Sequence, residues 1–136
     1  VALFAVLTAV GCGYYRSPAD RLRMSVGDYN DAVRWHYWKV AAQYIPPERR
    51  AEFIERREAE GDNMRITEYE IRSVSHDEAR QEAHVIVEFT WHRYPSLSLR
   101  HTRMRQTWSF ATGDWRMMAQ EEVHVEDSER RPEDMF

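Results

Sequence analysis

Apolar residues recur at helical intervals in the first half of this chain and at every second position in the second half. Over residues 26–44 they follow three- and four-residue steps, which predicts one long amphipathic helix. The pair Pro46-Pro47 ends this helix, and its second proline suits the first turn of another, largely charged helix at 47–60. The two-residue repeat then predicts four strands, at about 64–75, 80–94, 97–111 and 115–125.

The expected strands pair so that their apolar residues share one face. One side of the strand at 80–94 carries Ala83, Val85, Val87, Phe89 and Trp91. We expect residues whose numbers sum to about 193 to lie opposite each other across the second and third strands. Across the third and fourth strands the expected sum is about 225, and both pairings extend the apolar face. The first strand changes parity between Ile66 and Tyr69, which predicts a bulge that bends the sheet. The pattern predicts an α+β fold with two N-terminal helices packed on a curved four-stranded antiparallel sheet.

Composition and charge narrow the classes of function. The 136 residues carry a net charge of -4 with both signs mixed, so the chain lacks the positive field that nucleic-acid binding requires. Cys12 is the single cysteine, which excludes a disulfide within the chain. The sequence contains no Gly-rich phosphate loop and no HExxH helix, and we expect no cofactor. Five Trp and seven Tyr are enough to fill a core or to line a cavity.

The apolar run at residues 1–10 leads into the segment LTAVGC, which ends at Cys12. This segment resembles the lipobox of a bacterial lipoprotein signal peptide, and the run is too short for a membrane-spanning helix of about 20 residues. The resemblance implies cleavage before Cys12, acylation of Cys12 by diacylglyceryl and palmitate-type chains, and the membrane as a partner. Gly13 stands where an aspartate would retain the protein at the inner membrane, which implies the outer membrane, facing the periplasm. Since neither Met nor a basic segment precedes the run, we expect the natural chain to begin upstream of Val1.

Four segments carry a second resemblance: residues 28–35 (DYNDAVRW), 47–53 (PERRAEF), 106–108 (QTW) and 113–116 (GDWR). With the order of the elements, they resemble the NTF2-like superfamily, which includes ketosteroid isomerase and scytalone dehydratase. The resemblance implies a cone-shaped domain and a homodimer formed by sheets that pair face to face. It fixes no activity, because the superfamily contains both enzymes and binding modules. We therefore expect a signal peptide at 1–11, lipidated Cys12 with a tether to residue 23, an NTF2-like domain at 24–125, and a charged tail at 126–136.

The inward faces of the expected cone supply candidate site residues. The pocket-lining candidates are Trp35, Tyr37, Trp91, Gln106 and Trp108. They favour a non-catalytic module that binds a hydrophobic small molecule in the cone, or an envelope protein on the open face of the sheet. The alternative is an isomerase- or dehydratase-type enzyme, which needs a desolvated acid-base group inside the cone. For that alternative the candidate bases are Glu121, expected to face inward near the end of the last strand, and His36.

Two histidines form a weak candidate metal pair. The expected register places His92 opposite His101 on the outer face of the sheet. A catalytic zinc site takes three protein ligands, and the sequence fixes no third ligand beside this pair. We therefore expect an exposed cross-strand pair and no metal.

Overall fold

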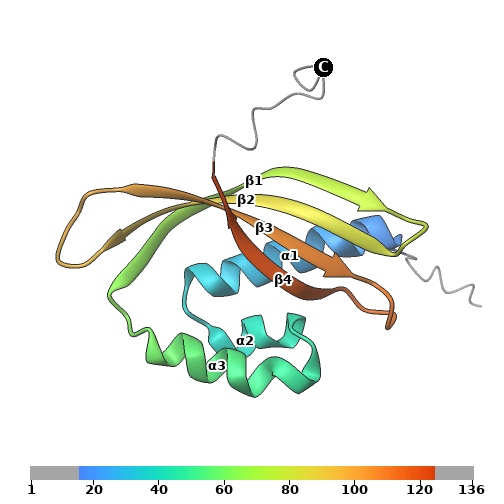
Figure 1. Ribbon diagram of the computed structural model, residues 1–136, viewed down its shortest axis with the longest axis horizontal. Coiled ribbons are helices and arrows are strands. Elements are labelled where there is room, and N and C mark those ends of the chain that lie inside the picture. Colours follow the sequence, from blue (N-terminus) through green and yellow to red (C-terminus); the bar gives the residue numbers. More distant parts are fainter. Residues whose placement is uncertain (1–15, 125–136) are drawn as a thin grey trace, which may run out of the picture.

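A computed structural model describes residues 16–124, so Cys12, the expected signal peptide and the expected tail lie outside the described residues. A long, curved antiparallel sheet lies over helices that all cover its concave face (Figure 1). The helices are α1 (Pro18–Arg34), α2 (Trp38–Ala41) and α3 (Arg50–Ala59), with 3-10 turns η1 (Ala42–Tyr44) and η2 (Pro47–Arg49). The strands follow in chain order across the sheet: β1 (Met64–Asp77), β2 (Glu82–Arg93), β3 (Arg100–Ser109) and β4 (Arg116–Val123). The predicted α+β architecture is confirmed.

The first expected helix is two helices in the structure. Helix α1 begins at Pro18, where the Ser17 hydroxyl accepts a hydrogen bond from a first-turn amide at 3.2 Å, so residues 18–23 are helical and not a tether. It ends at Arg34 because His36 adopts a left-handed φ of 57°, which no α-helix contains. The prediction of one helix over 26–44 is wrong at this turn. The turn directs the chain back beneath α1 and buries Ala41 of α2 in the core.

The β2–β3 register differs from the expected one by two residues. The paired residue numbers sum to 191 along the whole ladder, where 193 was expected. A slip of two keeps every side chain on its own face, so the alternation of apolar residues does not distinguish the two registers. As a consequence Thr90, and not His92, lies opposite His101, so the prediction of a cross-strand histidine pair is wrong.

A β-bulge changes the pairing of β3 with β4. Trp108 pairs with Met117 near the turn, as predicted. The register then shifts by one, which leaves Met118 as the extra residue of the bulge. Gln106 therefore lies opposite Gln120, where Ala119 was expected.

The same bulge reverses the face on which Glu121 lies. The carboxylate of Glu121 projects from the outer face, where it accepts a hydrogen bond from Arg105 at 3.1 Å, so the expected inward position is wrong. The bulge predicted for the first strand is confirmed, with one of the two β1 register shifts directly after Ile66.

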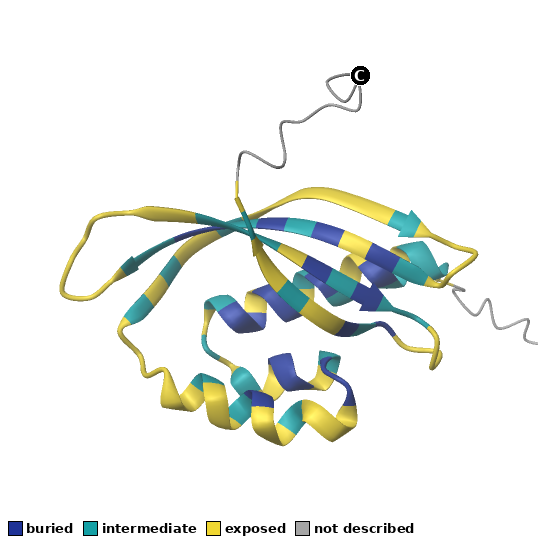
Figure 2. Cartoon of the chain, viewed as in Figure 1, coloured by how far each residue is buried: buried dark blue, intermediate teal, exposed yellow. Residues whose placement is uncertain are grey.

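The hydrophobic core lies between the concave face of the sheet and the helices (Figure 2). Its fully buried side chains include Leu22, Val26, Tyr29, Ala83, Val85, Val87 and Trp108. The core of the described residues runs from Leu22 to Met117, so a chain of residues 13–136 retains all of it. Among residues 16–124 no helix is long and apolar enough to cross a membrane.

Candidate functional site

Two cavities lie side by side between α3 and the concave face of the sheet. Their volumes are about 260 and 530 Å³, and they share the lining residues Arg57, Met104 and Gln120. We call the smaller one the apolar cavity, the larger one the arginine cavity, and the two together the α3 groove. Together they have the size of a small-molecule site.

The two cavities differ in chemistry. The apolar cavity is lined mainly by Val33, Met64, Ile66, Phe89, Trp91 and Met104, and Arg93, Thr102 and Glu122 complete its wall. The arginine cavity places Arg49, Arg56 and Arg57, together with Glu52 and Glu60, opposite Met117 and Met118. The α3 groove is therefore amphiphilic along its length.

A chain of buried amides lies beneath the groove. The amide nitrogen of Gln106 donates to Asn30 Oδ1 at 2.8 Å and to Gln120 Oε1 at 3.0 Å. Its oxygen accepts from the Trp108 indole N–H at 3.2 Å and from Asn30 Nδ2 at 3.3 Å. Gln106 and Asn30 are fully buried, so this network satisfies polar groups that would otherwise be costly to bury. Because the oxygen of Gln120 is engaged in the network, its –NH2 group is what remains for a ligand in the groove.

Tyr29 of α1 is a buried donor without an acceptor. Its ring packs edge-on against Trp108 at 5.7 Å and Tyr44 at 6.5 Å, and its side chain is 0% exposed. The hydroxyl has no hydrogen-bond partner among residues 16–124. Burial raises the pKa of Tyr29 to about 12, and the nearby positive charge of Arg57 opposes part of this increase. The hydroxyl end therefore remains protonated and lies close to Arg57 and Arg56 of α3, behind the groove and outside the lining of both cavities.

Arg57 lies at the junction of the two cavities. Its guanidinium sits over the rings of Trp38 and Phe53, at 5.6 and 5.5 Å from their centroids. One terminal nitrogen donates to Glu60 at 3.3 Å, whereas the buried Nε has no partner within the described part of the chain. A cation held in this way is a ready site for an oxyanion.

Of the five sequence-predicted pocket residues, the structure places one in the wall of the groove, two in the core beneath it and two on the surface. Trp91 lines the apolar cavity and donates its indole N–H to Thr102 at 2.9 Å. Gln106 and Trp108 lie fully buried directly beneath the groove. Trp35 and Tyr37 are on the surface, 59% and 61% exposed, because the turn at His36 carries them out of the helical stripe on which they were expected.

His36, the other candidate base, lines a separate cavity of about 170 Å³ with Trp38, Gly61 and Met64. Its ring stacks on Trp38 at 4.9 Å, and its Nδ1 lies 3.6 Å from Asp62. The groove itself contains neither His36 nor Glu121.

The candidate metal histidines have separate partners. Nδ1 of His92 lies 3.0 Å from the Ser96 carbonyl oxygen, and Nδ1 of His101 lies 3.1 Å from the Thr90 hydroxyl. Across residues 16–124 no three His, Cys, Asp or Glu side chains are grouped as metal ligands.

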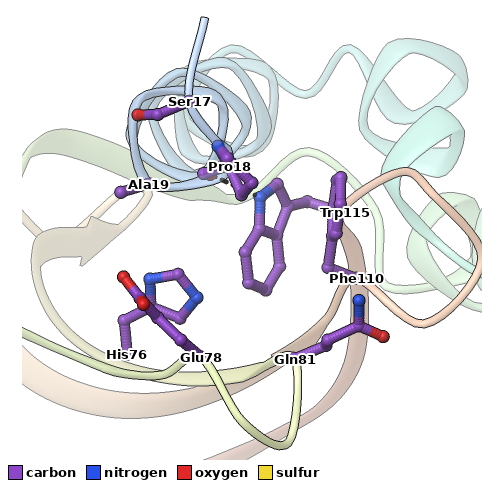
Figure 3. A pocket seen from close by; sticks show the side chains of 8 residues that line it. All are labelled: Ser17, Pro18, Ala19, His76, Glu78, Gln81, Phe110 and Trp115. Carbon is purple, nitrogen blue, oxygen red and sulfur yellow. Dashed lines mark hydrogen bonds between the residues drawn. The ribbon is translucent and has the colours of Figure 1, made fainter.

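A further cavity of about 320 Å³ lies where the β1–β2 turn meets the start of α1 (Figure 3). The indole of Trp115 fills its centre between His76 and Phe110, and its N–H donates to the Pro18 carbonyl at 2.8 Å. The exposed side chains of Glu78 and Gln81 form its rim. This arrangement anchors the N-terminus of α1 to the sheet.

The order of helices and strands, with the bent sheet, is that of the NTF2-like fold. A ketosteroid isomerase-like protein from Erwinia carotovora superposes with a TM-score of 0.60 at 13% identity, over 81% of this chain and 99% of that one. A SEC-C motif containing protein from Rhodopseudomonas palustris gives 0.58 at 19% identity, over 80% and 83%. The β subunit of benzoate 1,2-dioxygenase from Burkholderia mallei gives 0.57 at 12% identity, over 87% and 97%. No family model and no curated protein matches the chain, so these likenesses establish the fold and no activity.

Proposed function

We propose that this chain is a lipoprotein of the bacterial envelope, anchored through Cys12 to the outer membrane and facing the periplasm, whose NTF2-like domain binds a hydrophobic small molecule without catalysis. The single observation that carries the binding role is the α3 groove. It places a wall of Met, Phe and Trp side chains beside a wall rich in arginine and glutamate, so a concave apolar surface has polar groups within reach, as ligand sites usually do.

An enzymatic role finds less support. General acid-base catalysis needs a titratable group within reach of the substrate. Glu121 pairs with Arg105 on the outer face, and His36 lies in a neighbouring cavity on the far side of Trp38. Three glutamates do line the groove, Glu52, Glu60 and Glu122, but all three are exposed, whereas a general base of this kind needs desolvation to raise its pKa toward neutral.

The outer face of the sheet is the surface on which an envelope protein or a second copy would dock. It is dominated by charged side chains that already pair with one another, such as Glu88 with Arg72 and Arg103, at 2.8 and 2.7 Å. Desolvating such pairs is costly, which favours the groove as the main ligand site.

Two measurements test the proposal. Native mass spectrometry of residues 13–136, purified from a periplasm without detergent, is expected to show a retained small molecule; a clean apo mass in every preparation would contradict the binding role. Fractionation of cells that carry the complete gene is expected to place the protein in the outer membrane. The variant Cys12→Ser is expected to lose acyl-chain labelling, and unchanged labelling would contradict the anchor.

A further inference from the structure

We infer that the α3 groove selects an anionic amphiphile, whose apolar body lies in the apolar cavity and whose carboxylate is bound by Arg57 and Tyr29. This inference rests on the proposed function, because it names the chemical class of the ligand for the same site. It makes Arg57 and Tyr29 the residues that determine specificity.

The first support is a pair of buried donors that lack acceptors. The Tyr29 hydroxyl and the Arg57 Nε–H are both buried, and neither has a hydrogen-bond partner among the described residues. Arg57 lies close enough to the Tyr29 hydroxyl to lower its pKa, but a guanidinium cannot act as an acceptor, so the tyrosine O–H is left without one. Because buried polar groups are normally paired, two unpaired donors near each other indicate a ligand that brings an acceptor.

The second support is the asymmetry of the groove. On one side of Arg57, aliphatic, Met and aromatic side chains form most of the wall of the apolar cavity, which also includes Arg93 and Glu122. On the other side, two further arginines and two glutamates line the arginine cavity. A ligand with one apolar end and one negative end matches this arrangement at both ends. The –NH2 group of Gln120, which lines both cavities, supplies a further donor at the junction.

The charges around Arg57 favour a single negative charge on the ligand. Glu60 lies 3.3 Å from one terminal nitrogen of Arg57 and already offsets part of its charge, and Glu52 and Glu122 also line the groove. A phosphate dianion would face these carboxylates, whereas a single carboxylate needs only the free edge of the guanidinium. Arginine suits this role because its donors form a rigid planar fork.

The experiment compares ligands that share a ten-carbon chain and differ only in the head group. Decanoate, decan-1-ol and decyl phosphate are titrated calorimetrically into residues 13–136, below the concentrations at which they aggregate. We expect decanoate to bind about tenfold or more tightly than decan-1-ol, the factor that one charge-assisted hydrogen bond supplies.

Variants locate the head group. Tyr29→Phe and Arg57→Met are each expected to weaken decanoate binding about tenfold and to weaken decan-1-ol binding much less, because a neutral hydroxyl accepts a weaker hydrogen bond than a carboxylate. The control is Arg65→Met, which removes the same charge from the outer face of β1 and is expected to change neither affinity. If Arg57→Met does not fold, as judged by circular dichroism, Tyr29→Phe carries the test, since it retains the whole ring.

The outcomes separate this inference from the function on which it rests. Equal affinities for decanoate and decan-1-ol, or equal losses for both ligands in Tyr29→Phe, overturn the anionic head group while small-molecule binding stands. Tighter binding of decyl phosphate than of decanoate overturns the choice of a carboxylate. No binding of any of the three, together with a clean apo mass, overturns both proposals.

Discussion

Removing one oxygen atom from the core is expected to stabilise the unliganded protein. The substitution Tyr29→Phe retains a fully buried ring and its edge-on contacts with Trp108 and Tyr44, and it deletes a hydroxyl that has no partner among residues 16–124. Burying an unpaired hydroxyl costs about 1–3 kcal/mol, and this cost disappears in the variant. A small loss of packing around the missing oxygen offsets part of the gain. We expect the free energy of unfolding to rise by about 1 kcal/mol, or the Tm by about 4 °C.

The same substitution elsewhere supplies the control. The Tyr69 hydroxyl, at the edge of the sheet, donates to Asp31 Oδ1 at 2.8 Å. Tyr69→Phe loses this hydrogen bond to a carboxylate and is expected to lower the free energy of unfolding by about 1 kcal/mol. The two variants differ by the same single atom, so opposite signs isolate the effect of the missing partner from any general effect of replacing tyrosine by phenylalanine.

Urea denaturation followed by circular dichroism measures both changes. The midpoint should move up for Tyr29→Phe and down for Tyr69→Phe, with the same dependence on urea concentration as the parent protein. If Tyr29→Phe is destabilised as much as Tyr69→Phe, the Tyr29 hydroxyl has an acceptor in solution, and the argument for an unpaired donor fails. A stabilised variant that also binds decanoate less well would show that a destabilising hydroxyl is retained for ligand binding.

Three further substitutions test other parts of the structure. Hydrogen bonds from Arg72 and Arg103 lower the pKa of Glu88 to about 2 from 4.5, so its charge stabilises the fold above pH 4.5, and this contribution is lost as the pH falls toward 2. In urea denaturation at several pH values, Glu88→Gln should therefore be about 1 kcal/mol less stable than the parent at neutral pH and equal to it near pH 2; a difference independent of pH would contradict the linkage. Gln106→Leu should lower the free energy of unfolding by about 2–4 kcal/mol because it leaves Asn30 and the Trp108 indole without their hydrogen-bond partner. If Gln106→Leu destabilises the protein no more than Gln120→Leu does, the hydrogen bonds of the network are not cooperative. Trp35→Ser should change the free energy of unfolding by less than about 0.5 kcal/mol and leave decanoate binding unaltered, since the indole is 59% exposed; a clear loss of binding would return Trp35 to the site.

The sequence predicts the faces of the sheet well because side chains alternate strictly along a strand. Val85, Val87 and Phe89 are buried on the predicted face. The exact β2–β3 pairing is not predictable from this alternation, because sums of 191 and 193 bury the same residues. A candidate site that requires two residues to lie directly opposite each other, such as His92 and His101, therefore cannot be assigned from the alternation of side chains.

The helical turn at His36 and the position of Arg57 are harder to predict for a different reason. The segment from Trp35 to Tyr37 is as apolar as the helix before it, so periodicity extends the helix through a residue that adopts a left-handed φ. Arg57 belongs to a helix so rich in charge that its pattern is that of a solvated surface. Its role follows from the rings of Trp38 and Phe53, which hold the guanidinium over the groove, and the sequence pattern contains no sign of that contact.

The bulge at Met118 decides which chemistry faces the groove. Without it, Ala119 would lie opposite Gln106, whose amide nitrogen would lose the acceptor that Gln120 provides at 3.0 Å. Glu121 would then face inward, opposite Met104 and close to Arg57, as the uninterrupted alternation of the strand predicts. With the bulge, Glu122 takes this place opposite Met104 and lines the apolar cavity, so a glutamate stands at this position in either register. The inserted residue therefore changes the groove at the position opposite Gln106, where Gln120 completes the buried amide chain, and a bulge next to a cavity is better understood as part of the site than as an irregularity of the sheet.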